Sequence, residues 1–213
     1  MSEPIGYQDN IFINCPFDTP YQPLFRAIVF TIQQCGFAAR CALEEDSTGD
    51  VRIQKIIKII DECRYGVHDI SKADLDENSQ LARFNMPLEL GIFIGAHHFA
   101  PSKSYNSTKK YIVMDTEPYR YQKFISDLGG QDIKAYGTDA SKQIATIIQQ
   151  VRDFLRTSSR RKLPGPDYLT ERYETFLRVL PSICSTERLD IEKLTYLDYL
   201  TCAIGWLTES QEQ

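Results

Sequence analysis

The chain has 213 residues, 42% of them hydrophobic and 25% charged, which suits one medium-sized domain with a small appendage. The net charge of −5 and the pI near 5.3 argue against a dedicated nucleic-acid-binding protein, which would carry a basic surface. Six scattered cysteines without a C-x-x-C pair indicate reduced, buried thiols in a cytoplasmic protein. Since the sequence shows no signal-peptide pattern and no bilayer-spanning apolar run, we expect no membrane association.

Strand-like and helix-like patterns alternate over the first three quarters of the chain. In chain order, the patterns predict a strand at 11–13, a helix at 24–32, a strand at 37–43, a helix at 53–60, a strand at 65–70, a helix at 87–96, a strand at 111–115, a short helix at 119–128, a strand at 133–136 and a helix at 144–155. Asp50 is expected to cap the second helix. This alternation predicts an α/β domain with a parallel sheet of about five strands and helices on both faces.

The composition changes at the end of this domain. Small, basic, proline and glycine residues at 158–166 indicate a linker. Two helical patterns follow at 167–180 and 191–207, and Pro181 is expected to end the first of them. The predicted organisation is therefore an α/β domain at 1–157, a linker at 158–166 and a helical C-terminal extension at 167–213, which packs on this domain or on another subunit.

Glu89 is the only residue with a full formal charge in the long apolar segment at 84–102. On a helix begun by Pro87, it lies on an apolar face at the third helical position. A carboxylate at this position is either a helix cap or a functional group, and the sequence leaves both open. Gly91 and Gly95, which follow it, are expected to let the helix lie close to the sheet.

Ligands of parallel α/β sheets bind outside the carboxyl ends of the strands. Three predicted strands end on polar or turn-forming residues, namely Asn14, Cys15, Pro16 and Phe17 after the first, Asp69 on the third, and Asp115 on the fourth. Neither G-x-G-x-x-G nor G-x-x-x-x-G-K-[ST] occurs in the chain, which argues against a Rossmann dehydrogenase and a P-loop nucleotidase.

Three of these segments resemble nucleoside 2-deoxyribosyltransferases. Residues 12–17 are similar to their first strand and its Pro-Phe turn, 67–69 to their third strand, and 86–91 to the segment that carries their nucleophilic glutamate. The same core and a similarly placed glutamate occur in Toll/interleukin-1 receptor (TIR) domains that cleave NAD. The resemblance covers about residues 8–155 and implies a flavodoxin-like three-layer fold.

The resemblance implies that Glu89 attacks or stabilises the anomeric carbon of a ribosyl group, and that Asp69 holds the ribose hydroxyls or acts with Glu89. Asp69 could equally accept the backbone amides of its own turn. Arg83 stands where the transferases carry an acidic residue, which favours a phosphate-containing substrate over a bare nucleoside, although a solvated loop arginine is the simpler reading. The predicted substrate-binding residues are Tyr7, Asn14, Cys15, Pro16, Phe17, Arg83, Asn85, Met86 and Asp115, with Tyr7 or Phe17 stacking on the base.

We therefore predict cleavage or transfer at the N-glycosidic bond of a nucleotide or dinucleotide, with NAD as a candidate and no metal or other cofactor. The alternative is a non-catalytic nucleotide-binding or signalling module that acts through a partner or through self-association. The expected partners are a nucleotide or NAD-like small molecule and further copies of the chain, but no membrane or nucleic acid. The resemblance also suggests a toxin or an antiviral-defence effector.

Overall fold

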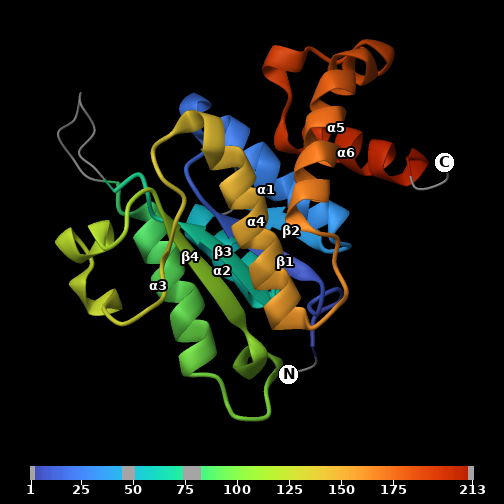
Figure 1. Cartoon of the computed structure of the whole chain (residues 1–213). Coiled ribbons are helices and arrows are strands. Elements are labelled where there is room, and N and C mark those ends of the chain that lie inside the picture. The colour runs from blue at the N-terminus through green and yellow to red at the C-terminus, as the bar shows by residue number, and fades with distance from the viewer. Residues whose placement is uncertain (1–2, 45–50, 74–82, 211–213) are drawn as a thin grey trace.

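The computed structural model describes residues 3–44, 51–73 and 83–210 (Figure 1). Its strands are β1 (Asn10–Asn14), β2 (Ala38–Cys41), β3 (Tyr65–Asp69), β4 (Lys110–Asp115) and β5 (Lys134–Ala135). They form one parallel sheet in the order β2-β1-β3-β4-β5. This is the flavodoxin-like strand order, and the predicted α/β fold with five parallel strands is confirmed.

Helices cover both faces of this sheet. The α-helices in the described residues are α1 (Gln22–Gln34), α2 (Arg52–Asp61), α3 (Asn85–His98), α4 (Ala140–Ser159), α5 (Pro166–Thr186) and α6 (Tyr196–Glu209). Short 3-10 helices lie at Thr19–Tyr21, Tyr105–Thr108, Arg120–Lys123, Ser126–Leu128 and Ile191–Lys193. Helices α1 and α4 pack on one face and α2 and α3 on the other, so the domain has three layers (Figure 1).

The side chains of the strands alternate between the two helical layers. On β1, Ile11 and Ile13 join the core under α1 and α4, whereas Phe12 joins the core under α2 and α3. All five residues of β1 are buried, as expected for a strand that has helices on both sides. This alternation decides which helical layer each residue at the carboxyl end of a strand faces.

The C-terminal extension shares the core of the α/β domain. Phe30 of α1 packs its ring against Tyr173 and Phe176 of α5 and Trp206 of α6, with centroid distances of 5.2, 5.3 and 6.0 Å. The buried residues of α5 and α6 belong to the same cluster as those of α1 and α4. Helix α5 lies against α4 and α1, and α6 lies against α1 (Figure 1).

Several predicted helix boundaries are wrong. Pro181 lies inside α5, which continues to Thr186, because buried Leu180 and Cys184 on either side hold the helix in the shared core. The short helix expected at 119–128 is two 3-10 turns. Val51 occupies the N-cap of α2, and Asp50, which was expected there, lies outside the described residues.

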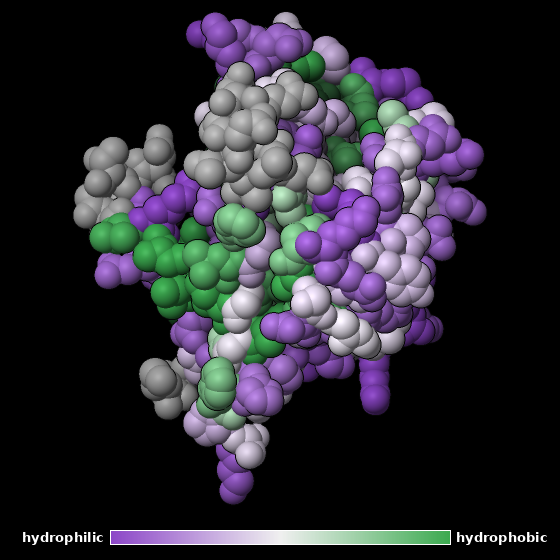
Figure 2. All heavy atoms as spheres, turned by 90° about the vertical axis from the view of Figure 1, so that its left-hand side faces the viewer, coloured by the Kyte–Doolittle hydropathy of each residue, from purple (hydrophilic) through white to green (hydrophobic). Residues whose placement is uncertain are grey.

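Apart from Glu89 and the polar residues at its ends, helix α3 is apolar on every side, yet one side of it faces solvent. Phe84, Leu88 and Phe99 are 63%, 54% and 84% exposed. A Cβ atom on Gly91 would meet no atom within 4 Å, and one on Gly95 would meet only the ring of Phe99. The prediction that these glycines let the helix lie close to the sheet is therefore wrong. Figure 2 shows an apolar area on this side of the molecule. No helix in the described segments is long and apolar enough to cross a bilayer.

Candidate functional site

The candidate site lies at the carboxyl end of β1 and β3, where the strand order reverses and flavodoxin-like sheets bind ligands. Asn14 and His68 are paired in register at this point, and the Asn14 amide lies 3.1 Å from Nδ1 of His68. The same Asn14 amide nitrogen donates a hydrogen bond of 2.8 Å to the carbonyl of Met86. Asn14 therefore fixes the first turn of α3 to the sheet, and Met86 takes part through its backbone, with its side chain buried.

His68 is a neutral, structural residue in this arrangement. Its ring is fully buried, and burial lowers its pKa to about 3. The rings of Phe12 and Phe93 pack edge-on against it. A Cβ atom at position 66 would lie 2.5 Å from Nε2 of His68, so only glycine fits there.

Glu89 extends from α3 in a buried position, at 7% exposure. Phe84 is the N-cap of α3, so Pro87 occupies the third helical position and Glu89 the fifth. The predicted start of the helix at Pro87 is wrong, and with it the capping explanation of Glu89. No described residue donates a hydrogen bond to its carboxylate, and burial raises its pKa to about 7, against a smaller lowering by Arg52.

Asp69 faces the other helical layer. Its Oδ2 accepts a hydrogen bond of 2.6 Å from the Tyr21 hydroxyl, and its Oδ1 accepts one of 2.8 Å from the Ser71 amide. It is completely buried, which raises the pKa of its carboxyl. Because Asp69 bonds to Tyr21 on the α1 side and Glu89 extends from α3, the two residues belong to different helical layers, and their joint action stays a prediction. Asp69 fixes the turn that contains Tyr21 to the end of β3.

The loop after β1 supplies both buried and accessible groups. Cys15 and Pro16 are buried, and desolvation raises the pKa of the Cys15 thiol well above its usual value. Cys15 is thus a packing residue that remains a thiol. Phe17 is half-buried and packs edge-on against Phe25, at a centroid distance of 5.2 Å. Of the predicted residues in this loop, Phe17 is the one that a ligand can reach.

Arg83 and Asn85 lie at the exposed start of α3. Nη1 of Arg83 lies 3.3 Å from Oδ2 of Asp18 in the loop after β1, so this ion pair joins the two loops that border the site. Both residues are accessible at the start of α3, and their contact with a substrate stays a prediction.

Tyr7 and Asp115 are placed differently from the prediction. Tyr7 precedes β1 and so lies at the amino edge of the sheet, buried, with its hydroxyl donating to the carbonyl of Tyr105 at 2.8 Å. It cannot stack on a base at the carboxyl edge, and that prediction is wrong. Asp115 is buried and accepts a hydrogen bond of 2.8 Å from Nε of Arg120, whose Nη2 donates to the carbonyl of Ser71 at 2.6 Å. Asp115 thus links the ends of β4 and β3 rather than facing solvent.

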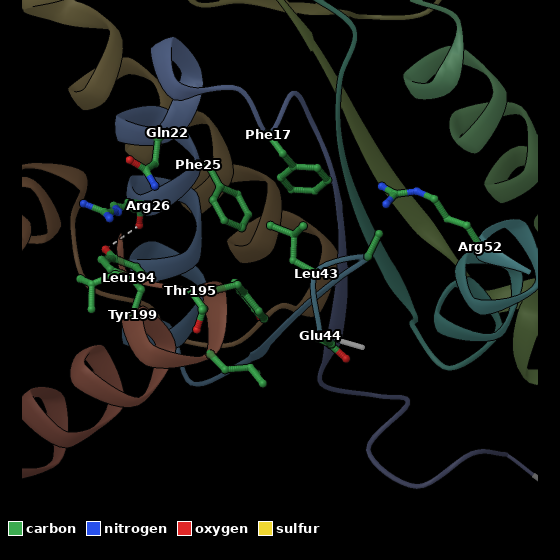
Figure 3. A pocket seen from close by; sticks show the side chains of 13 residues that line it. Phe17, Gln22, Phe25, Arg26, Leu43, Glu44, Arg52, Leu194, Thr195 and Tyr199 are labelled. Atoms are coloured by element: carbon green, nitrogen blue, oxygen red, sulfur yellow. Dashed lines mark hydrogen bonds between the residues drawn. The ribbon is translucent and has the colours of Figure 1, made fainter. Parts of the chain in front are cut away.

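Sequence reasoning missed Arg52 and the groove beside it. A groove of about 520 Å³ runs between the ends of β1 and β2 and the start of α6, with Arg52 at one side (Figure 3). Arg52 is exposed and occupies the first position of α2, where a positive charge opposes the helix dipole. That unfavourable placement is the sequence signal that could have revealed it.

Comparisons with protein-family models, with curated proteins and with solved structures found no match to this chain. In the part of the chain that the structure describes, no group of three or more His, Cys, Asp or Glu side chains is arranged to hold a metal ion.

Proposed function

We propose that this protein cleaves or transfers at the N-glycosidic bond of a nucleotide or dinucleotide, with Glu89 as the group that meets the anomeric carbon. The observation that supports this proposal is the state of Glu89. Its carboxylate is buried at the carboxyl edge of the sheet, has a pKa raised to about 7, and is not used to cap its helix. A buried carboxyl group that does not cap its helix, and that lies at the edge of the sheet where ligands bind, is a candidate functional group.

The chemistry follows from the charge that develops in such a reaction. As the bond from C1′ to the base breaks, the ribosyl group gains oxocarbenium character, which an adjacent carboxylate stabilises or captures as a covalent intermediate. Positive charge at the anomeric centre also favours the ionised form of Glu89, and so offsets the effect of burial. Water as acceptor gives hydrolysis, and a second base gives transfer.

Arg52 and the pair Asp18–Arg83 favour a phosphorylated substrate. Both arginines lie at the rim of the site, and guanidinium groups bind phosphate oxygens through paired hydrogen bonds. NAD satisfies this requirement and carries a cationic nicotinamide ring that is a good leaving group. An enzyme of this kind would deplete its nucleotide, which is the basis for a toxin or antiviral-defence role.

The test is base release from NAD and from nucleotides by the purified protein, separated by liquid chromatography. We expect Glu89→Gln to lower the rate by at least about 100-fold because it removes the carboxylate and keeps the shape of the side chain. Glu174→Gln, an exposed glutamate of α5, is the control and retains the rate of the original protein. Equal rates in Glu89→Gln and the control would contradict the proposal.

A second candidate function is a nucleotide-binding module that acts through self-association. It is favoured by the uncharged outer face of α3, formed by Phe84, Leu88, Gly91, Gly95 and Phe99, on which a second copy of α3 could pack. In the same experiment this candidate predicts no base release at any protein concentration. It also predicts equal thermal stabilisation by NAD in the original protein and in Glu89→Gln.

A further inference from the structure

The groove beside Arg52 has the shape and the lining of a small-molecule site, although it contains none of the groups proposed for bond cleavage. Its volume of about 520 Å³ falls within the usual range for ligand pockets. Phe17, Phe25 and Leu43 lie near one another in the groove (Figure 3). Leu197 of α6 lines it from the C-terminal extension. Leu43 and Leu197 are 40% and 49% exposed, so this apolar lining remains accessible.

The charged groups around the groove favour an anionic ligand. Arg26 and Arg52 both line it, and the guanidinium of Arg26 lies over the ring of Tyr199, 5.3 Å from its centroid. Glu44, the acidic residue in the described part of the lining, is bound by Arg40 with an Nε–Oε2 distance of 2.7 Å. Among its described lining residues, the groove therefore offers two guanidinium groups and no carboxylate that is not already bound to an arginine.

Arg52 connects the groove to Glu89 electrostatically. The charge of Arg52 acts on the Glu89 carboxyl, and Arg52 also lines the groove. The Glu89 carboxylate in turn acts on the thiols of Cys15 and Cys41, which lie within two residues of the lining residues Phe17 and Ala42. A ligand with one end at Glu89 can therefore pass Arg52 and place its other end in the groove.

We propose that the groove is a second subsite, which binds the distal nucleoside of a dinucleotide whose scissile ribosyl group lies at Glu89 and whose pyrophosphate lies at Arg52. The inference rests on the function proposed above and narrows its substrate class to pyrophosphate-linked dinucleotides. Phe17 and Phe25 provide aromatic rings against which a base packs, and Arg52 matches the negative charge of the pyrophosphate, whereas Arg26 lies at the opposite side of the groove (Figure 3). The C-terminal extension then has a role in substrate selection, because α6 supplies one wall.

Two substrates with the same scissile bond test this inference. NAD and nicotinamide mononucleotide both release nicotinamide, but the mononucleotide has no distal nucleoside to fill the groove. We expect kcat/KM to be at least about tenfold higher for NAD. Leu197→Glu, at the second position of α6 where an acidic residue suits the helix dipole, should raise the KM for NAD about tenfold and leave the mononucleotide unaffected. Leu177→Glu changes an exposed leucine of α5 outside the groove and is the control.

The outcomes separate this inference from the function on which it rests. If both substrates react equally well and Leu197→Glu affects neither, the second subsite is refuted while cleavage at Glu89 stands. If neither substrate releases base, the proposed function is refuted. Binding of adenosine diphosphate then tests, independently of any reaction, whether the groove is a nucleotide site. Thermal stabilisation by adenosine diphosphate that Leu197→Glu abolishes and Leu177→Glu retains would support a nucleotide site there, and stabilisation equal in all three proteins would overturn it.

Discussion

The isolation of Glu89 in an apolar setting affects stability as well as chemistry. Its pKa is raised from 4.5 to about 7 in the folded protein, so between these pH values the folded state holds more protons than the unfolded state. The free energy of unfolding therefore falls as the pH rises through this range. A shift of this size corresponds to a loss of about 3 kcal/mol at pH 8.

Glu89→Gln should abolish this part of the pH dependence, because a glutamine side chain does not ionise. We expect the variant to be more stable than the original protein at pH 8, with the difference shrinking toward pH 4.5, as measured by urea denaturation across this range. The difference between the two proteins removes the contributions of other titrating groups, among them buried Asp69 and Asp115. A variant whose stability declines as steeply as that of the original protein would show that Glu89 is not buried as described.

Single residues of the site could be predicted where their chemistry stands out from their neighbours. Glu89 is detectable because it is the one charge in a long apolar segment, and Asn14 because it ends a buried strand. The burial of these side chains and the identity of their hydrogen-bond partners could not be predicted in the same way. The bonds of Asp69 to Tyr21, and the position of Tyr7 at the opposite edge, depend on contacts between residues far apart in the chain.

At the level of elements, the apolar strands were predictable and the ends of helices were not. Strands β1 and β3 are short and buried along their whole length, and the apolar run of β1 is visible without a structure. Helix ends depend on tertiary packing, which carries α5 through Pro181 and begins α3 before Pro87. The outward position of Gly91 follows from the orientation of α3, which spacing alone does not define.

Lys109 is a buried lysine that joins two elements. Its ammonium donates to the carbonyl oxygens of Ile60 at 2.6 Å and of Cys63, at the end of α2, and lies 4.8 Å from the ring centroid of Phe93. Burial lowers its pKa to about 8. The side chain therefore fixes the carboxyl end of α2 to the start of β4, on the face that carries α3.

Lys109→Met should destabilise the protein by about 2–3 kcal/mol, because it removes two charged hydrogen bonds and leaves buried carbonyl oxygens without a donor. Methionine keeps the length and the apolar contacts of the stem, so the loss reports the ammonium group. Lys110→Met is the matched control: Lys110 is exposed, and its bond to the carbonyl of Ser158 should be worth less than about 0.5 kcal/mol. Equal losses in the two variants, measured by urea denaturation, would exclude this role of Lys109.

At the level of the whole molecule, the C-terminal extension and the α/β domain should unfold together, because they bury one another's apolar surface. Phe176 of α5 is fully buried and contacts Phe30 of α1, Tyr199 and Trp206. Such an arrangement leaves the core of the domain incomplete without the extension. It also places the single tryptophan of the chain at the contact between the two parts.

Phe176→Ala should cost about 3–5 kcal/mol through lost burial and the cavity that remains. Since the core is shared, the urea transition followed by Trp206 fluorescence should coincide with the transition of the far-ultraviolet circular dichroism, before and after the substitution. Leu177→Ala, at an exposed neighbouring position, should change stability by about 0.5 kcal/mol or less. If the substitution lowers the urea midpoint of the fluorescence transition but not that of the circular dichroism transition, the extension unfolds independently.

All six cysteines are reduced and buried, and they are distributed over β2, α5, α6, the loop after β1 and the ends of α1 and α2. Burial raises the pKa of the thiols at Cys35, Cys41 and Cys63, which further suppresses the reactive thiolate. An alkylating reagent can therefore modify each thiol only when the surrounding structure opens. The native cysteines can therefore report local unfolding in several elements without an engineered cysteine. The alkylation rate of each thiol, measured separately, would rank the free energies of local opening around it.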